Sequence, residues 1–326
     1  MLSRIAQELF WLGRNIARAE HTARMLDGVF QASLQSNSDG FGSGSVQLGW
    51  RSILAIMGAD AGGDVEREEV MRRMTIDRHE PASVISCVAR ARESARTVRD
   101  VISAEMWEAL NTTNLRLADP AVEHNLSELG PYLFFQLVKE RSALFWGLNS
   151  RTMLRDEARA FLVAGGRFES ADMVLRMLRV TLPAPGQEFT DAESRATGLL
   201  DGQAQALLQA VGGFQAFRRA VPSPPQAGPV ARFLLYERSY PDSVAASVDA
   251  VQQALTDADR DPRRSDPVLR LARLGADLEF RGRVAIDRAS ISETCELVQR
   301  ELMLVDADIA TRYFVGSTMP AGTVHA

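Results

Sequence analysis

Apolar residues recur every three or four positions along the first thirty residues of the chain. Because this spacing averages about 3.5 residues, it predicts a long helix whose apolar stripe packs against another helix. The stretch SNSDGFGSGS, residues 36–45, is rich in glycine and serine, so we expect the helix to end before it. The stripe consists of Ile5, Leu9, Leu12, Ile16, Ala19, Ala23, Leu26 and Phe30.

The same spacing predicts further helices along the chain. One begins at Pro81, a residue favoured in the first helical turn, and its apolar positions continue as far as Met106. Alternation of apolar and polar residues with a period of two, which is typical of strands, is nearly absent. We therefore predict an all-α fold, a bundle of long helices. The other expected helices begin near Pro131 or cover residues 152–182, 202–220, 228–236, 242–257, 266–283 and 290–314.

Two segments of the first half of the chain resemble two segments of the second half, in the same order. Residues 1–26 align without a gap on residues 153–178, and residues 70–88 align on residues 230–248. Chance similarity between helices explains one such match more easily than two. The pair of matches therefore indicates duplication of a unit of about 150 residues.

A duplication has consequences for the domain organisation. We expect two related halves, residues 1–150 and 151–314, that pack around a pseudo-two-fold axis as one body. The stripe helices would then meet at small aligned residues, near Ala19 and Ala171, because small side chains let helix axes approach closely. The last residues, 315–326, are expected to form a flexible tail.

Charged residues flank the apolar stripe of the first helix. Glu20 and Arg24 stand four residues apart, in the orientation that favours an ion pair on a helix. The acid recurs in the second copy as Asp172, beside Arg176. A carboxylate at the edge of a stripe needs a cationic partner, which fits a structural role. A polar pocket on the pseudo-axis fits the same residues, so both interpretations stay open.

Two further charged clusters have similar alternatives. Residues 90–100, RARESARTVRD, include Glu93 and Arg96 in a ladder of spacings of three and four. Such a ladder is typical of an exposed, ion-paired helix face, although arginines of this kind also bind phosphate or carboxylate groups. Arg155 lies at the start of a helix, followed by two acids that complement the helix dipole.

Composition excludes several classes of function. The formal net charge is −5, which gives no support for nucleic-acid binding, because that needs a concentrated basic surface. No apolar run approaches the length of about 20 residues that spans a membrane, and the N-terminus does not resemble a signal peptide. The two cysteines, Cys87 and Cys295, form no disulfide framework. We therefore expect a cytoplasmic protein that does not bind membranes.

The usual motifs of catalysis and cofactor binding are missing from the sequence. The four histidines are scattered without metal-ligand spacing, and no Glu-x-x-His pair of a di-iron bundle occurs. No phosphate-binding glycine pattern opens a helix, and the glycine-rich stretch at residues 58–64 is interpreted as a turn. Cys87 fits a buried helix position better than a nucleophile. We expect neither a metal nor a cofactor.

Three stretches carry a resemblance to a known family. They are LSRIAQELFWLGRNIARAEHTARMLD, ASVISCVARARESARTVRDVISAEMWEALN and TMLRDEARAFLVAGGRFESADMVLRML, which follow one another along the chain. Together they resemble the alpha-E domain family, helical bacterial proteins named for a Glu-Arg motif. The resemblance implies a partnership with a circularly permuted ATP-grasp protein, and also with a transglutaminase-like protein, in an amide- or peptide-ligating system.

The sequence departs from the Glu-Arg motif of the family in both copies. Ala17 stands where the family word has glutamate, while the following Arg18 is kept. In the second copy Glu169 is kept and Ser170 replaces the arginine. Each copy thus retains one half of the pair. The motif would be complete again if Arg18 and Glu169 met across the two halves.

Two hypotheses of function follow. The first is a non-catalytic helical partner of an ATP-grasp ligase, which binds and positions the ligase or its substrate. The second is an enzyme of the same pathway, in which Arg14, Arg18, Glu20 and Asp172 line a pocket for a substrate with a carboxylate or phosphate group. Glu20 and Asp172 are the candidate catalytic acids of this second hypothesis, and association with a second copy of the chain stays open. The candidate binding residues are Arg14, Arg18, Glu20, Arg24, Glu93, Arg96, Arg155 and Glu169.

Overall fold

The computed structural model describes residues 1–38, 49–59, 66–128, 130–182, 193–284 and 288–314. These residues form helices and connecting turns and contain no strand, which confirms the prediction of an all-α fold. The expected tail and most of the Gly/Ser-rich stretch lie outside the described residues. The α-helices are α1 (Ser3–Ser38), α2 (Trp50–Met57), α3 (Arg67–Thr75), α4 (Val84–Thr97), α5 (Ala104–Leu117), α6 (Pro120–Glu128), α7 (Tyr132–Thr152), α8 (Glu157–Thr181), α9 (Glu193–Ala210), α10 (Phe214–Ala220), α11 (Ala227–Tyr236), α12 (Val244–Ala258), α13 (Asp266–Gly282) and α14 (Arg288–Ile309).

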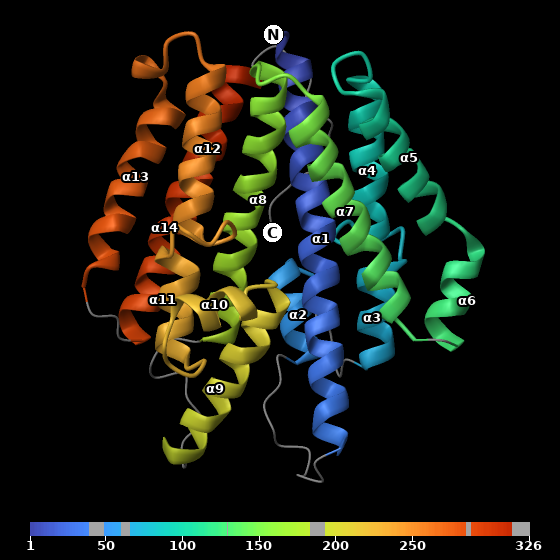
Figure 1. Cartoon of the computed structure of the whole chain (residues 1–326), viewed down its shortest axis with the longest axis vertical. Helices are drawn as coiled ribbons and strands as arrows, with labels where there is room; N and C mark the ends of the chain where they lie inside the picture. Colours follow the sequence, from blue (N-terminus) through green and yellow to red (C-terminus); the bar gives the residue numbers. More distant parts are fainter. Residues whose placement is uncertain (39–48, 60–65, 129, 183–192, 285–287, 315–326) are drawn as a thin grey trace.

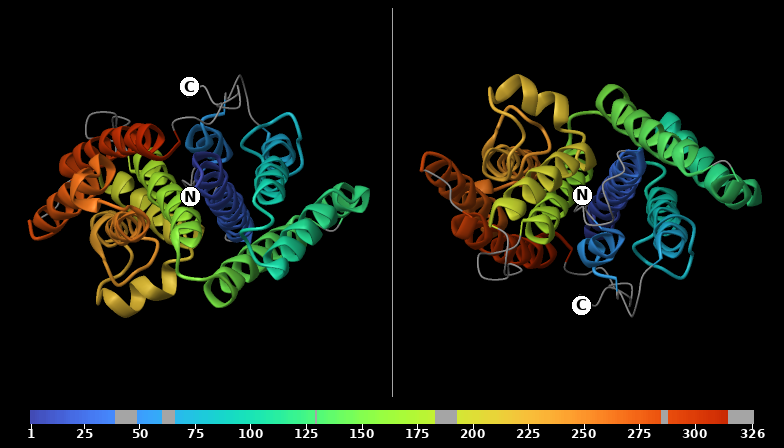
Figure 2. Two further views of the ribbon diagram at one scale, coloured as in Figure 1. Left: turned by 90° about the horizontal axis from the view of Figure 1, so that it is seen from above. Right: turned by 90° about the horizontal axis from the view of Figure 1, so that it is seen from below.

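Two long helices, α1 and α8, lie side by side at the centre of the bundle (Figures 1 and 2). Helix α4 packs on α1 and helix α12 packs on α8, so each central helix has its own flanking helix. Helices α4, α5 and α7 lie on one side of the central pair, and α11–α14 lie on the other side. This arrangement is the one that a duplication predicts, while the duplication itself and the division near residue 150 stay predictions.

Glycines allow the two central helices to touch through their backbones. A Cβ atom added at Gly13 would lie 2.1 Å from the carbonyl oxygen of Leu162, and one at Gly165 would lie 1.9 Å from that of Phe10. Both distances are far shorter than any allowed contact. The two aligned glycines therefore set the distance between α1 and α8, as the small residues of the stripe predicted.

One expected helix proves to be two. The stretch from Pro81 to Met106 is interrupted between Thr97 and Ala104, so the single helix predicted there is wrong. The Ser103 hydroxyl oxygen accepts a hydrogen bond from the backbone N–H of Met106 at 3.2 Å and caps the start of α5. The apolar spacing continues across the interruption because Val98 and Ile102, in the turn, are themselves buried.

The helix expected over residues 202–220 is also divided. Helix α9 ends at Ala210 and α10 begins at Phe214, because Gly212 adopts a left-handed backbone with φ of 71°. Helices α2, α3 and α6 were not predicted. Helix α3 has a short, charge-rich sequence, REEVMRRMT, and its nine residues span too few turns to establish a period.

Within the described residues, no helix combines the length and the apolar composition that a membrane span requires.

Candidate functional site

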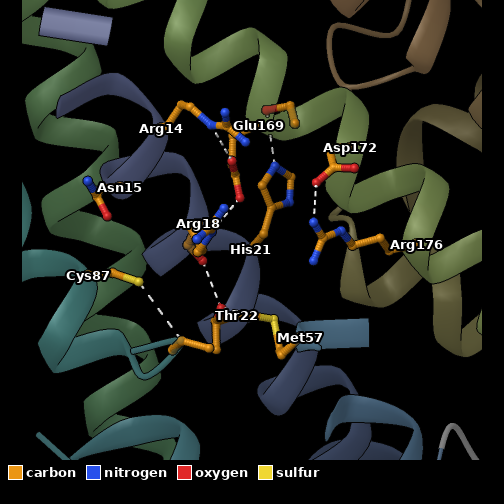
Figure 3. Close-up of polar contacts among 12 residues, drawn as sticks. Arg14, Asn15, Arg18, His21, Thr22, Met57, Cys87, Glu169, Asp172 and Arg176 are labelled. Carbon is orange, nitrogen blue, oxygen red and sulfur yellow. Dashed lines mark hydrogen bonds and ion pairs between the residues drawn. The ribbon is translucent and has the colours of Figure 1, made fainter. Parts of the chain in front are cut away.

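Glu169 lies at the point where α1 and α8 face each other, and its side chain is fully buried. Its Oε2 accepts a hydrogen bond from Arg14 Nε at 2.9 Å, and its Oε1 accepts one from Arg18 Nε at 2.5 Å (Figure 3). Arg14 Nη1 also donates to Asp306 Oδ1 of α14 at 2.9 Å. We call these four residues the buried ion cluster. It joins α1, α8 and α14, and it brings together Arg18 and Glu169, the two residues that each keep one half of the Glu-Arg motif.

Arg14 is enclosed by aromatic rings as well as carboxylates. Its guanidinium carbon lies 4.7 Å from the ring centroid of Trp11 and 4.8 Å from that of Phe168. Only 4% of the residue is exposed. On a single helix Arg14 falls opposite the apolar stripe, where a side chain is expected to face solvent, and the structure corrects this expectation. Phe168 of α8 and Asp306 of α14 contact Arg14, and residues 310–314, which follow α14, pack on α1.

The cluster fixes the charge of its central carboxylate. Burial by itself would raise the pKa of Glu169, but the positive charges of Arg18 and Arg14 outweigh burial and lower this pKa to about 2. The Glu169 carboxylate in turn raises the pKa of Arg18 above its usual value. Glu169 therefore stays ionised at neutral pH, and both of its oxygens are already occupied by guanidinium groups. A carboxylate in this state is a poor general acid or base.

The two candidate catalytic acids each have a partner on their own helix. Arg24 donates to Glu20 Oε1 through Nε at 2.9 Å and Nη2 at 2.8 Å. Figure 3 shows the second pair, in which Arg176 Nη2 lies 2.8 Å from Asp172 Oδ2. Both ion pairs have the spacing of four that the sequence predicted. We expected one pocket lined by Glu20, Asp172, Arg14 and Arg18. The structure does not bring these four side chains together, because the two arginines bind Glu169.

The remaining predicted binding residues lie on the surface. Arg96 Nε donates to Glu93 Oε2 at 2.8 Å, and Arg92 Nη1 donates to Glu93 Oε1 at 2.6 Å, all on the exposed face of α4. Arg155 is exposed in the short connection between α7 and α8. Of the two alternatives for the ladder on α4, the geometry favours an ion-paired face, since Glu93 already occupies its arginines.

A pocket that sequence reasoning missed lies beside the central helices. It has a volume of about 440 Å³ and is bordered by α1, α7 and α8, so we call it the α1–α8 pocket. His21 of α1 lines it, and the His21 Nε2 atom lies 3.1 Å from the hydroxyl oxygen of Ser170. Glu20 is the one earlier candidate that lines it. The other polar side chains of the wall are Asn149, Ser150, Arg159, Arg167 and Asp242.

Cys87 is completely buried in α4, as the sequence predicted. Burial raises the pKa of its thiol, although the nearby guanidinium of Arg90 partly opposes this effect. The thiol is therefore protonated at neutral pH and unsuited to attack a substrate. Among the residues that the structure describes, no group of three or more His, Cys, Asp or Glu is placed to hold a metal ion.

Comparison with models of known protein families identifies the family to which the chain belongs. The model of the Alpha-E family, described as a predicted alpha-helical domain with a conserved ER motif, matches residues 1–314. No curated protein and no solved structure matches the chain. The chain belongs to the Alpha-E family.

Proposed function

We propose that this protein is a non-catalytic helical component of an amide- or peptide-ligating system, where it binds and positions an ATP-grasp-type ligase or the substrate of that ligase. The observation that carries the non-catalytic part is the state of Glu169, which is fully buried and bound by Arg14 and Arg18. A catalytic acid must reach a substrate, and this carboxylate is enclosed by its own protein. The ligase partnership rests on the family resemblance alone.

The other two acids support the same view. Glu20 and Asp172 are both held in ion pairs, with Arg24 and Arg176. Ion pairs that recur at aligned positions of the two central helices fit the structural role considered for these acids, and they agree with a non-catalytic protein. The second hypothesis loses its anion clamp, because Arg14 and Arg18 are occupied by Glu169.

Co-purification tests the partnership. The full chain, tagged and co-expressed with the ATP-grasp protein encoded beside it, is expected to retain that protein through size-exclusion chromatography. An ATP-grasp protein from an unrelated system provides the control. Separate elution of the two partners at micromolar concentration would contradict the partnership. A transglutaminase-like neighbour and a second copy of the chain can be tested in the same way.

Turnover in the reconstituted pair tests the non-catalytic role. We expect Asp172→Asn to lower the thermal stability of the protein slightly, because the Asp172–Arg176 pair is lost, while product formation by the ligase stays close to wild type. Asp172 does not line the α1–α8 pocket, so a folded Asp172→Asn protein that abolishes product formation would contradict the non-catalytic role.

A further inference from the structure

Three residues of the α1–α8 pocket wall each carry a buried polar atom that has no hydrogen-bond partner. Among the described residues, the buried side-chain atoms without a hydrogen bond include His21 Nδ1, Asn149 Oδ1 and Arg159 Nε, and all three residues line this pocket. His21 and Asn149 are only 5% and 3% exposed. Buried polar groups are almost always satisfied, since an unmade hydrogen bond costs free energy. Three such atoms around one cavity indicate the position of a ligand.

A second, larger depression provides a contrast. It measures about 770 Å³ and lies between α11 and α13, bordered by residues such as Arg232, Tyr236 and Gly282. None of the unpartnered buried atoms of the described residues belongs to its wall. Size alone would favour this depression, but the unmet hydrogen-bonding capacity favours the α1–α8 pocket.

The sequence alignment of the two central helices explains why the pocket is open. The buried ion cluster contains Arg14, Arg18 and Glu169. The residues aligned with them in the other copy are Gly166, Ser170 and Ala17, and all three of these line the pocket. Long charged side chains thus fill the space at one set of positions. At the other set the side chains are small, and the indole of Trp146 packs against Gly166 as part of the pocket wall.

Four ionisable side chains besides His21 determine the charge of the wall. Two are the arginines Arg159 and Arg167 and two are the acids Glu20 and Asp242, so the formal charges of the wall sum to zero. Arg167 is already paired with Asp242, at 2.9 Å. A neutral lining favours a ligand without net charge over a phosphate or a polyamine, because the desolvation of an unbalanced charge is costly.

The unpartnered atoms specify the two ends of the ligand. Arg159 Nε–H requires an acceptor, for which a carboxylate oxygen is the strongest choice, whereas Asn149 Oδ1 requires a donor such as an N–H group. His21 Nδ1 fits either end, depending on its tautomer. The indole of Trp146 adds an aromatic wall, which packs on apolar groups and attracts an ammonium group. A neutral molecule with both a carboxylate and an N–H group is a zwitterion.

We propose that the α1–α8 pocket binds a small zwitterion, a free α-amino acid or a dipeptide, with its carboxylate on Arg159 and its N–H group on Asn149. The proposal rests on the binding role proposed above, but it does not depend on the ligase. Binding is measured on the isolated protein and the partnership on the mixture, so that either can fail without the other.

Isothermal titration calorimetry of the full chain tests the proposal. The probes are the common L-amino acids and L-alanyl-L-alanine, compared with propionate, ethylamine and inorganic phosphate, which each carry one kind of group. We expect saturable binding of at least one zwitterion with a Kd between about 1 µM and 1 mM, and none for the single-function probes. Absence of saturable binding for every zwitterion, or saturation by phosphate or propionate alone, would overturn the proposal.

Variants locate the bound zwitterion. Arg159→Gln and Asn149→Leu are each expected to weaken binding about tenfold or more, because each removes one of the two recognised ends. Arg219→Gln, at an exposed arginine of α10 outside the pocket wall, is the matched control and is expected to bind like wild type. Unchanged affinity in both pocket variants would overturn the proposal.

A filling variant provides an independent test. The double substitution Ala17→Glu with Ser170→Arg places at the pocket the residue types that Glu169 and Arg18 provide in the buried ion cluster, where they form an ion pair. We expect this variant to stay folded, as measured by circular dichroism, and to lose zwitterion binding. A folded variant that binds with wild-type affinity would show that the ligand lies elsewhere.

Discussion

Glu169 is the residue on which the centre of the bundle depends. Its carboxylate is fully buried, and two guanidinium groups from α1 compensate for the loss of water. A buried pair of this kind contributes little net free energy compared with apolar residues, but removing one partner costs about 3–5 kcal/mol because the other charge is left uncompensated. The cluster therefore specifies how α1 and α8 pair more than it adds to stability.

The titration of Glu169 gives the first residue-scale prediction. Its pKa falls from 4.5 to about 2 on folding, so its contribution to stability is fully present above pH 4.5. That contribution is lost as the pH falls from 4.5 through about 2, since the unfolded chain takes up the proton first. Urea unfolding across this range is expected to show a steeper loss of stability in the wild type than in Glu169→Gln. Equal slopes would contradict the assignment.

The contacts of the cluster were predictable only in part. The sequence showed that the Glu-Arg motif would be complete only if Arg18 and Glu169 met, and the structure places them in contact. Burial of Arg14 was not predictable, because the periodicity of α1 shows where its own stripe lies but not that Asp306 and residues 310–314 lie against the opposite side. The pocket was missed for a related reason. Its signal in the sequence was the small size of Gly166 and Ser170 at positions aligned with arginines. Small residues alone do not predict a pocket.

The contact between α1 and α8 determines the packing at the scale of elements. Gly13 and Gly165 bring the two backbones together, and no side chain fits between them. Most other helices pack on one of these two, so the distance between α1 and α8 affects the whole core. Glycine inside a helix costs roughly 0.5–1 kcal/mol relative to alanine, and the close packing here offsets that cost.

Substitution of these glycines is the element-scale prediction. Gly13→Ala is expected to lower the free energy of unfolding by about 1–3 kcal/mol or more, because its Cβ would lie 2.1 Å from a backbone oxygen of α8. The matched control is Gly147→Ala in α7, where a Cβ has no neighbour within 4 Å. The control is expected to gain up to about 1 kcal/mol from helix propensity. Chemical denaturation measures both, and a stabilising Gly13→Ala would refute the close approach.

Helix boundaries show where sequence patterns stop being informative. The long helices, with repeated apolar spacing, were predicted close to their observed positions. The break before α5 was hidden because turn residues such as Val98 are buried in the same register as the helix. The break between α9 and α10 results from the left-handed backbone of Gly212. A glycine in the sequence permits this conformation but does not require it, so the break could not be predicted. Short helices such as α2 lack enough turns for a period to be recognised.

At the scale of the molecule, the contact between α1 and α8 joins the two predicted halves, residues 1–150 and 151–314. The connection between α7 and α8 is only a few residues long, and Leu154 within it is exposed. The buried ion cluster and the glycine contacts cross between α1 and α8 without using this connection. The association of the halves therefore does not depend on the continuity of the chain.

Cleavage of this connection is the corresponding prediction. With a protease site inserted after Leu154, the cut chain is expected to elute as one species in size-exclusion chromatography. The result should hold at a salt concentration of about 1 M, since buried ion pairs are screened far less than exposed ones. The uncut protein is the control. Two separate fragments in native buffer would mean that the α1–α8 contact is too weak to hold the halves.

The central claim is that the Arg-Glu motif of this protein is a structural cluster and not a catalytic one. Urea unfolding of Glu169→Gln tests it most directly, with Glu93→Gln, which breaks an exposed pair with Arg96, as control. We predict that Glu169→Gln loses about 3–5 kcal/mol of unfolding free energy and that the control loses less than about 1 kcal/mol. A Glu169→Gln protein as stable as the wild type would contradict the claim.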